Sequence, residues 1–99
     1  MAVGLVLEFA GVGRREYEAV NSRLGINMEA GSGDWPDGLM KHTAGTDHDG
    51  NLVVMEVWTS RDAQERFMRD RLGAAVAGAG ISAVPRLTWL DLLADHHPG

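Results

Sequence analysis

His42 and Glu56 could form a pair that moves a proton. They belong to two short apolar segments, 39–46 and 51–60, which are separated by the tetrapeptide Asp-His-Asp-Gly. A carboxylate within a few ångströms of an imidazole stabilises the protonated ring and fixes which nitrogen of the neutral ring carries the proton. Such a pair could remove a proton from a phenol or an activated C–H bond, which is general-base catalysis. It could equally be a structural pair that closes an interface between subunits.

The hairpin between the two segments decides whether these side chains meet. A three-residue loop, 48–50, with Gly50 in the left-handed conformation, places His42 opposite Glu56. A two-residue Asp-Gly loop would shift the pairing by one residue and place Thr43 opposite Glu56 instead. We favour the first register because it gathers one coherent wall. Its members are Met40, His42 and Ala44 on one strand and Val54, Glu56 and Trp58 on the other, with Met40 opposite Trp58.

Two further aromatic residues are candidates for ligand binding. Trp35 stands in the glycine-rich segment 25–38 and could be a lid that stacks on an aromatic ligand, or a simple anchor for that loop. Tyr17 is expected to pack in the core with its hydroxyl at the rim of a cavity. The predicted substrate-binding residues are therefore Trp58, Val54, Met40, Trp35 and Tyr17, and the predicted catalytic residues are His42 and Glu56.

Other sequence patterns do not indicate a site. The segment "GVGRRE" has Glu16 where a dinucleotide-binding loop needs its third glycine, and "DHDGN" lacks the ligand spacing of a calcium loop. His96 and His97 in the tail are held by nothing that the sequence predicts. With no cysteine in the chain, thiolate catalysis, disulfides and cysteine-based metal sites are excluded. We expect no metal and no cofactor.

Composition restricts the partners of this chain. It has 99 residues, a net charge of −5 and a single lysine, Lys41, so no basic stripe is available for nucleic acid. No apolar run is long enough to cross a membrane, and a basic leader is absent from the start. We therefore expect a cytoplasmic protein with one domain, residues 1–95, followed by a tail, 96–99.

The hydrophobic periodicity predicts a βαββαβ order. Strands are expected at 3–10, 39–46, 51–60 and 86–93, and helices at 14–24 and from Ser60, the predicted N-cap, to about Gly80. This order is the ferredoxin-like α+β arrangement, a four-stranded antiparallel sheet with both helices on one face. The other face is left bare. We expect it to carry Leu52, Val54 and Trp58, and to be covered by a second copy in a homodimer.

The tract "VWTSRDAQERF", which begins at Val57, resembles the dimeric α+β barrel superfamily, and within it the antibiotic-biosynthesis-monooxygenase type of domain. The resemblance covers essentially the whole chain. It implies a homodimer with a ligand cavity in each protomer between sheet and helices or loops, and it places Trp58 in the cavity wall.

The same resemblance bears on activity. The cofactor-free quinone-forming members have an asparagine four residues before that tryptophan and a tyrosine six residues after it, where this chain has Val54 and Gln64. The haem-degrading members have an iron-binding histidine where this chain has Ala77, so the chain departs from their mode of haem binding.

Several functions remain open at this point. The chain could be a small enzyme acting on a flat apolar or aromatic metabolite, either as a cofactor-free monooxygenase or as a proton-transferring isomerase or cyclase. It could also be a non-catalytic dimeric protein that only binds a small molecule or serves in stress, or a dimerising module with a solid core.

Overall fold

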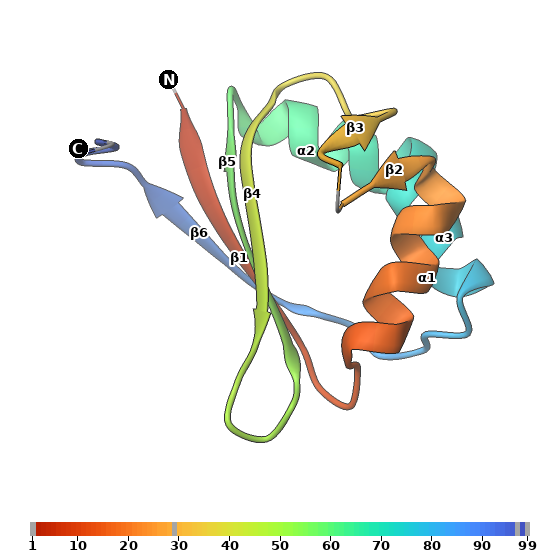
Figure 1. The fold of residues 1–99 in the computed structure, drawn as a ribbon. Helices are drawn as coiled ribbons and strands as arrows, with labels where there is room; N and C mark the ends of the chain where they lie inside the picture. The colour runs from red at the N-terminus through yellow and green to blue at the C-terminus, as the bar shows by residue number, and fades with distance from the viewer. Residues whose placement is uncertain (1, 29, 97, 99) are drawn as a thin grey trace.

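The chain forms a four-stranded antiparallel sheet with its helices on one face (Figure 1). The computed structural model describes residues 2–28, 30–96 and 98. The sheet has the order β4-β5-β1-β6. In chain order the elements are β1 (Val3–Phe9), α1 (Arg14–Leu24), β2 (Ile26–Asn27), β3 (Ser32–Gly33), β4 (Leu39–Thr46), β5 (Leu52–Trp58), α2 (Arg61–Phe67), the π-helix η1 (Met68–Leu72), α3 (Gly73–Gly78) and β6 (Arg86–Asp91). The predicted ferredoxin-like α+β fold is confirmed.

Local interactions set the helix ends where the sequence predicts them. The Glu16 carboxylate accepts a hydrogen bond from the Gly13 N–H at 3.0 Å, which satisfies a donor at the start of α1. Gly25 ends that helix in the left-handed conformation, with φ of 76°. The Ser60 hydroxyl accepts a hydrogen bond from the Ala63 N–H at 3.2 Å and caps α2.

The second helix contains a wide turn that the sequence analysis did not foresee. Helical backbone continues from residue 61 to 78, but residues 68–72 form a π-helix. The Gly73 N–H bonds to the carbonyl oxygen of Met68, five residues earlier, and a Cβ at Gly73 would lie 3.0 Å from that oxygen. Short π segments of this kind are frequent at functional sites, and this one carries Arg71 and Leu72.

The glycine-rich segment after α1 is more ordered than expected. It contains the short hairpin of β2 and β3, in which Ile26 pairs with Gly33. A Cβ at Gly33 would lie 2.2 Å from the Gly25 carbonyl oxygen, and φ at Gly33 is 117°, so only glycine fits there. The second strand of this hairpin and the residues on either side of it, 30–38, are here called the Trp35 loop, which returns the chain to β4.

The predicted hairpin register of β4 and β5 is confirmed at its centre. His42 pairs with Glu56, and Ala44 pairs with Val54. The predicted pairing of Met40 with Trp58 is wrong, because the register shifts between Leu39 and Lys41 and Leu39 takes the place opposite Trp58. Such a bulge adds one residue to one strand, and the side chain of that residue no longer follows the alternation between the two faces of the sheet. Met40 is 58% exposed as a result.

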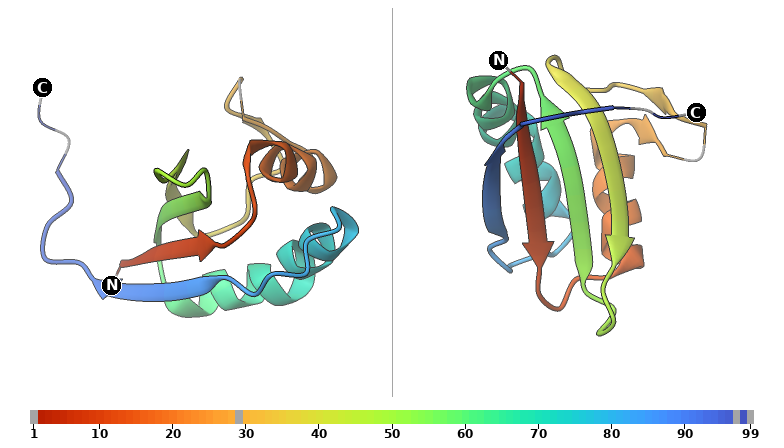
Figure 2. Two further views of the ribbon diagram at one scale, coloured as in Figure 1. Left: turned by 90° about the horizontal axis from the view of Figure 1, so that it is seen from below. Right: turned by 90° about the vertical axis from the view of Figure 1, so that its left-hand side faces the viewer.

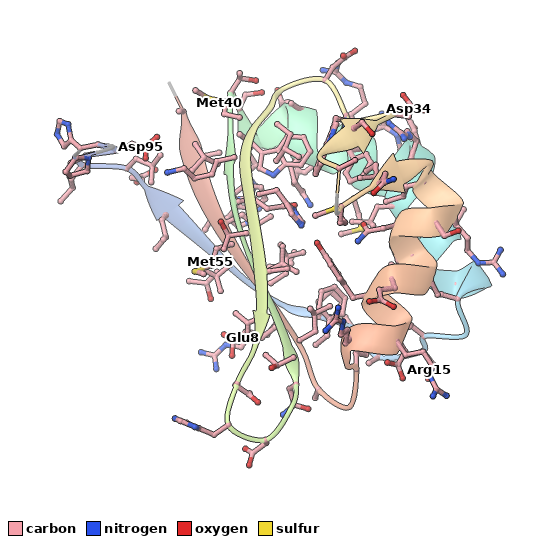
Figure 3. The ribbon with its side chains drawn as sticks, in the orientation of Figure 1. Glu8, Arg15, Asp34, Met40, Met55 and Asp95 are labelled. Atoms are coloured by element: carbon pink, nitrogen blue, oxygen red, sulfur yellow. The ribbon has the colours of Figure 1, made fainter. Side chains whose placement is uncertain are left out.

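The prediction for the bare face of the sheet is also wrong. Leu52, Val54 and Trp58 are buried on the inner face, the face covered by the chain's own helices. The outer face, away from the helices, instead carries Met55, which is 50% exposed and visible on that side in Figure 3. Both sides of β5 are rich in apolar residues, so alternation alone could not show which side the helices cover. In Figure 2 (right) the outer face is turned toward the viewer and the helices lie behind the strands.

No helix within residues 2–28 and 30–96 is long and apolar enough to cross a membrane.

Candidate functional site

A small cavity lies between the inner face of the sheet and the helices. Its walls are mainly apolar and include Leu7, Val20, Leu24, Val54, Phe67 and Ile81. The space that the centre of a water molecule can reach is about 60 Å³. One water needs about 10–15 Å³ on this measure, so the cavity has room for a few waters. The location agrees with the cavity implied by the resemblance to the α+β barrel proteins.

Four polar side chains form a continuous hydrogen-bonded series, here called the polar chain: Tyr17, His42, Glu56 and Trp58. Tyr17 Oη lies 2.6 Å from His42 Nε2, and His42 Nδ1 lies 2.8 Å from Glu56 Oε2. The Trp58 Nε1–H donates to the other carboxylate oxygen, Glu56 Oε1, at 3.0 Å. The side chains of His42 and Glu56 are only 12% and 10% exposed.

The chemistry of the partners assigns the direction of each hydrogen bond. The indole N–H of Trp58 can only donate, and an ionised carboxylate can only accept. Glu56 therefore accepts from Trp58 and from the Nδ1–H of His42. This leaves Nε2 of the neutral ring as a hydrogen-bond acceptor, and the Tyr17 hydroxyl donates to it.

Tyr17 is an end member of the polar chain and borders the cavity. It comes from α1, on the opposite side of the cavity from the strands that carry the rest of the polar chain. Burial raises the pKa of the Tyr17 hydroxyl; the hydrogen-bonding influence of the nearby Asn21 side chain opposes the rise, although Asn21 Nδ2 forms no hydrogen bond of good geometry with it, and the Glu56 carboxylate adds to the rise. Tyr17 is therefore protonated at neutral pH and can donate to His42. The expected position of its hydroxyl, at the edge of a cavity, is found.

Asn21 is a cavity residue that sequence reasoning missed. It follows Tyr17 by four residues on α1 and so lies on the same helix face. Its side chain is 7% exposed, and its Nδ2 has no hydrogen-bond partner among the described residues. The available signal was a polar residue within the apolar stripe of a helix, between Val20 and Leu24.

Trp35 borders the cavity and also anchors its own loop. Its ring lies 5.8 Å from the His42 ring, centre to centre, at a tilt of 59°. Its Nε1–H donates to the Gly31 carbonyl at 3.2 Å. The Trp35 loop is attached to η1 by Arg71, whose guanidinium donates to the Asp34 carbonyl at 2.7 Å and to the Leu24 carbonyl at 3.0 Å.

Two of the predicted substrate-binding residues lie elsewhere. Met40 is turned outward by the bulge and does not border the cavity. Trp58 is fully buried, with 0% exposure, and stands behind Glu56 rather than in the cavity wall. Val54, Tyr17 and Trp35 do border the cavity, together with His42 and Glu56.

Among the residues that the structure describes, no group of three or more His, Asp or Glu side chains is placed to hold a metal ion. His97, named with His96 in the sequence analysis, lies outside the described residues.

Comparison with known proteins identifies the fold. No family model matches the chain, and no curated protein matches it in sequence. Solved structures do match. Rv0793 from Mycobacterium tuberculosis has a TM-score of 0.66 at 17% identity over 98% of this chain and 100% of its own. SnoaB, a cofactor-independent oxygenase from Streptomyces nogalater, has a TM-score of 0.65 at 20% identity over 95% of each chain.

A third match is a protein from Caulobacter crescentus CB15 classed with the antibiotic biosynthesis monooxygenases. Its TM-score is 0.66 at 23% identity, over 94% of this chain and 91% of its own. The backbone is thus shared along nearly the whole length, although the sequences have diverged widely. The chain has the ferredoxin-like α+β fold of the antibiotic-biosynthesis-monooxygenase-like proteins.

Proposed function

We propose that this protein is a small homodimeric enzyme that transfers a proton to or from an apolar or aromatic metabolite bound in the cavity, without a cofactor. The observation that carries this proposal is the polar chain itself. A carboxylate, an imidazole and a phenol are joined by short hydrogen bonds, and they end at the wall of an otherwise apolar cavity. Few, convergent polar groups on an apolar wall are typical of a small-molecule site.

Two features make the His42–Glu56 pair suited to general-base work. The Glu56 carboxylate fixes the Nδ1–H tautomer and so directs the basic Nε2 toward α1 and the cavity. The pair is largely shielded from water, which strengthens its electrostatic interactions with a bound molecule. A proton taken from the substrate can therefore be held on the imidazole next to a carboxylate.

The size of the cavity limits how a ligand can enter. An apolar cavity of about 150 Å³ is known to bind benzene, and the space of about 60 Å³ found here is smaller. A ring-shaped ligand therefore requires outward movement of the Trp35 loop. Because that loop covers His42, such a movement would uncover the polar chain at the same time.

The composition of the outer face supports the proposed dimer. Val6, Met55 and Val57 form its apolar centre, and Lys41, Glu8 and Arg86 lie on strands around it. An apolar centre with a charged rim is typical of an interface, and a second copy of the same sheet would bury it.

Two chemistries fit a site of this kind. One is that of a cofactor-free oxygenase, the activity named for SnoaB, in which the polar chain would take a proton from the substrate. An isomerase or cyclase needs only the proton transfer. The oxygenase asparagine and tyrosine positions hold Val54 and Gln64 here, and Gln64 does not border the cavity, so we favour proton transfer. Those same two residues favour our second candidate, a dimer that binds a small molecule without converting it.

Exchange of protons between 2-tetralone and D2O tests the proposal. The probe is flat and mostly apolar, and it has a C–H bond that is acidified by its carbonyl group. The wild-type protein is expected to accelerate deuterium incorporation at that carbon. His42→Ala and Glu56→Gln should each reduce the protein-dependent rate by about 100-fold or more, since a positioned base contributes about 10²–10⁴-fold.

Glu18→Gln is a matched control for Glu56→Gln, because Glu18 is an exposed residue on α1 whose ion pair is with Arg14, which is exposed as well. Its exchange rate should equal that of the wild type. Saturable binding of 2-tetralone without any exchange would support the binding function instead. Full exchange activity in both His42→Ala and Glu56→Gln would remove this pair from the reaction.

A further inference from the structure

The unpartnered amide of Asn21 is the feature of this cavity that the polar chain does not explain. A buried N–H group without an acceptor destabilises a fold, and such groups are rare in native proteins. Asn21 Nδ2 is buried, lacks a partner within the part of the chain that the structure describes, and belongs to a residue in the cavity wall. A leucine would suit the apolar stripe of α1 better. The amide is therefore available for an acceptor atom that a ligand brings.

The hydrogen bonds of His42 identify which atom of the polar chain meets that ligand. Nδ1 is bonded to Glu56 and Nε2 is bonded to Tyr17, so both ring nitrogens are occupied. A proton from the cavity can therefore reach the imidazole through Tyr17 Oη. The hydrogen of that hydroxyl lies in the hydrogen bond to His42, and the oxygen keeps lone pairs that can accept a proton.

We propose that Tyr17 Oη and Asn21 Nδ2 are the two atoms that contact the substrate, and that the substrate is a small, mostly apolar ketone with an acidic C–H bond beside its carbonyl group. This inference rests on the proposed function and specifies its substrate class. The two residues share one face of α1, one turn apart, so a carbonyl oxygen at Asn21 places the neighbouring carbon near Tyr17.

The proton and electron movements balance within this arrangement. The substrate C–H bond breaks and its proton goes to Tyr17 Oη, while the Tyr17 proton moves to His42 Nε2. The electron pair of the C–H bond forms the C=C bond of an enolate, and the carbonyl π pair moves to oxygen. Asn21 donates to that oxygen, where the negative charge develops. Glu56 faces the imidazolium that results. Where the ketone also carries a C=C bond between its β and γ carbons, the enolate is a dienolate, and return of the proton to the γ carbon completes an isomerisation to the conjugated ketone.

Two variants test the inference in the 2-tetralone exchange assay. Tyr17→Phe keeps the ring but removes the oxygen, and exchange should fall by about 100-fold or more. Asn21→Leu keeps the volume but removes the donor, and exchange should fall by about 100-fold, the usual effect of losing one donor to a developing oxyanion. Asn21→Leu should also bind 2-tetralone more weakly than the wild type, while both proteins bind tetralin, which has no oxygen, equally.

Gln64→Leu is the matched control. Gln64 is the other buried residue with an unpartnered amide nitrogen in the described chain, but it lies outside the cavity. Both leucine variants should melt at higher temperature than the wild type, and only Asn21→Leu should lose exchange. Wild-type exchange that persists in Tyr17→Phe and Asn21→Leu would overturn this inference and leave the proposed function standing. Absence of exchange in the wild type would overturn both.

Discussion

At the scale of single residues, the site depends on how few hydrogen-bonding options its side chains have. Trp58 can only donate, the Glu56 carboxylate can only accept, and each therefore fixes its neighbour. The Tyr17 hydroxyl can donate a hydrogen bond to His42 and at the same time accept one from a molecule in the cavity. Its ionisation is thus the event in this series that titration can observe directly.

The only tyrosine of the chain is Tyr17, so tyrosinate absorbance reports its ionisation alone. The pKa of Tyr17 is raised in the folded protein, chiefly by burial, so the absorbance midpoint should lie at higher pH in the native protein than in urea. Above the unfolded pKa, near 10, the native state binds more protons than the unfolded state. The free energy of unfolding should therefore fall as pH rises through the folded pKa, and Tyr17→Phe should lack that part of the decrease.

The pairing of His42 with Glu56 was predictable because the turn that sets the register is local. Asp47 Oδ1 accepts hydrogen bonds from the backbone N–H groups of Asp49 and Asn51, and Gly50 has φ of 81°. The free amide of Asn21 was not predictable. Whether a polar group on a helix finds a partner depends on side chains from distant strands, and one-dimensional periodicity does not contain that information.

At the scale of elements, the wide turn of η1 joins parts of the fold that are far apart in sequence. Arg71 projects from this turn and binds the end of α1 and the Trp35 loop together, and its guanidinium also lies 5.4 Å from the centre of the Phe67 ring. The sequence predicted a helix through this region correctly. It gave no sign of the π turn, because the wider hydrogen-bond ring is selected by packing of the whole helix rather than by residue type.

Replacing Arg71 with Met should loosen the Trp35 loop. The substitution keeps the aliphatic stem but removes both donors to the Leu24 and Asp34 carbonyls, so the free energy of unfolding should fall by about 1–3 kcal/mol. Amide hydrogen exchange should accelerate in residues 30–38 more than in β1 or β5. Asp34→Asn is the control, since it retains the carbonyl contact and loses only an ion pair whose carboxylate is 77% exposed. Equal exchange in wild type and Arg71→Met would contradict this role.

At the scale of the whole molecule, the chain covers one side of its sheet and leaves the other apolar. The sequence predicted a bare face but assigned it to the wrong side of β5, because Leu52 and Val54 on one side and Val53 and Met55 on the other are similarly apolar. The larger residues of the inner face, including Trp58, fill the space under the helices. The outer set includes Val6, Met55 and Val57, whose apolar side chains suit contact with a second sheet.

A charge at the centre of the outer face should separate the proposed dimer. Met55 lies between Thr43 and Val6 in the sheet and is half exposed, so Met55→Asp would bury a carboxylate in the interface. Light scattering after size-exclusion chromatography should show a dimer for the wild type and a monomer for this variant. Val84→Asp is the control, because Val84 is 90% exposed in the loop before β6. A monomeric wild type would refute the dimer.

The indole of Trp58 gives the protein a built-in optical reporter. It is fully buried, and its indole N–H donates to the carboxylate that faces His42. The emission colour of an indole responds to the electric field of nearby charges. Each proton that arrives at or leaves the imidazole changes that field from a fixed position, in surroundings that are largely shielded from water. Once the emission of Trp35 and Trp89 is removed by substitution, the charge on the imidazole can thus be followed by Trp58 fluorescence, without any label attached to the molecule.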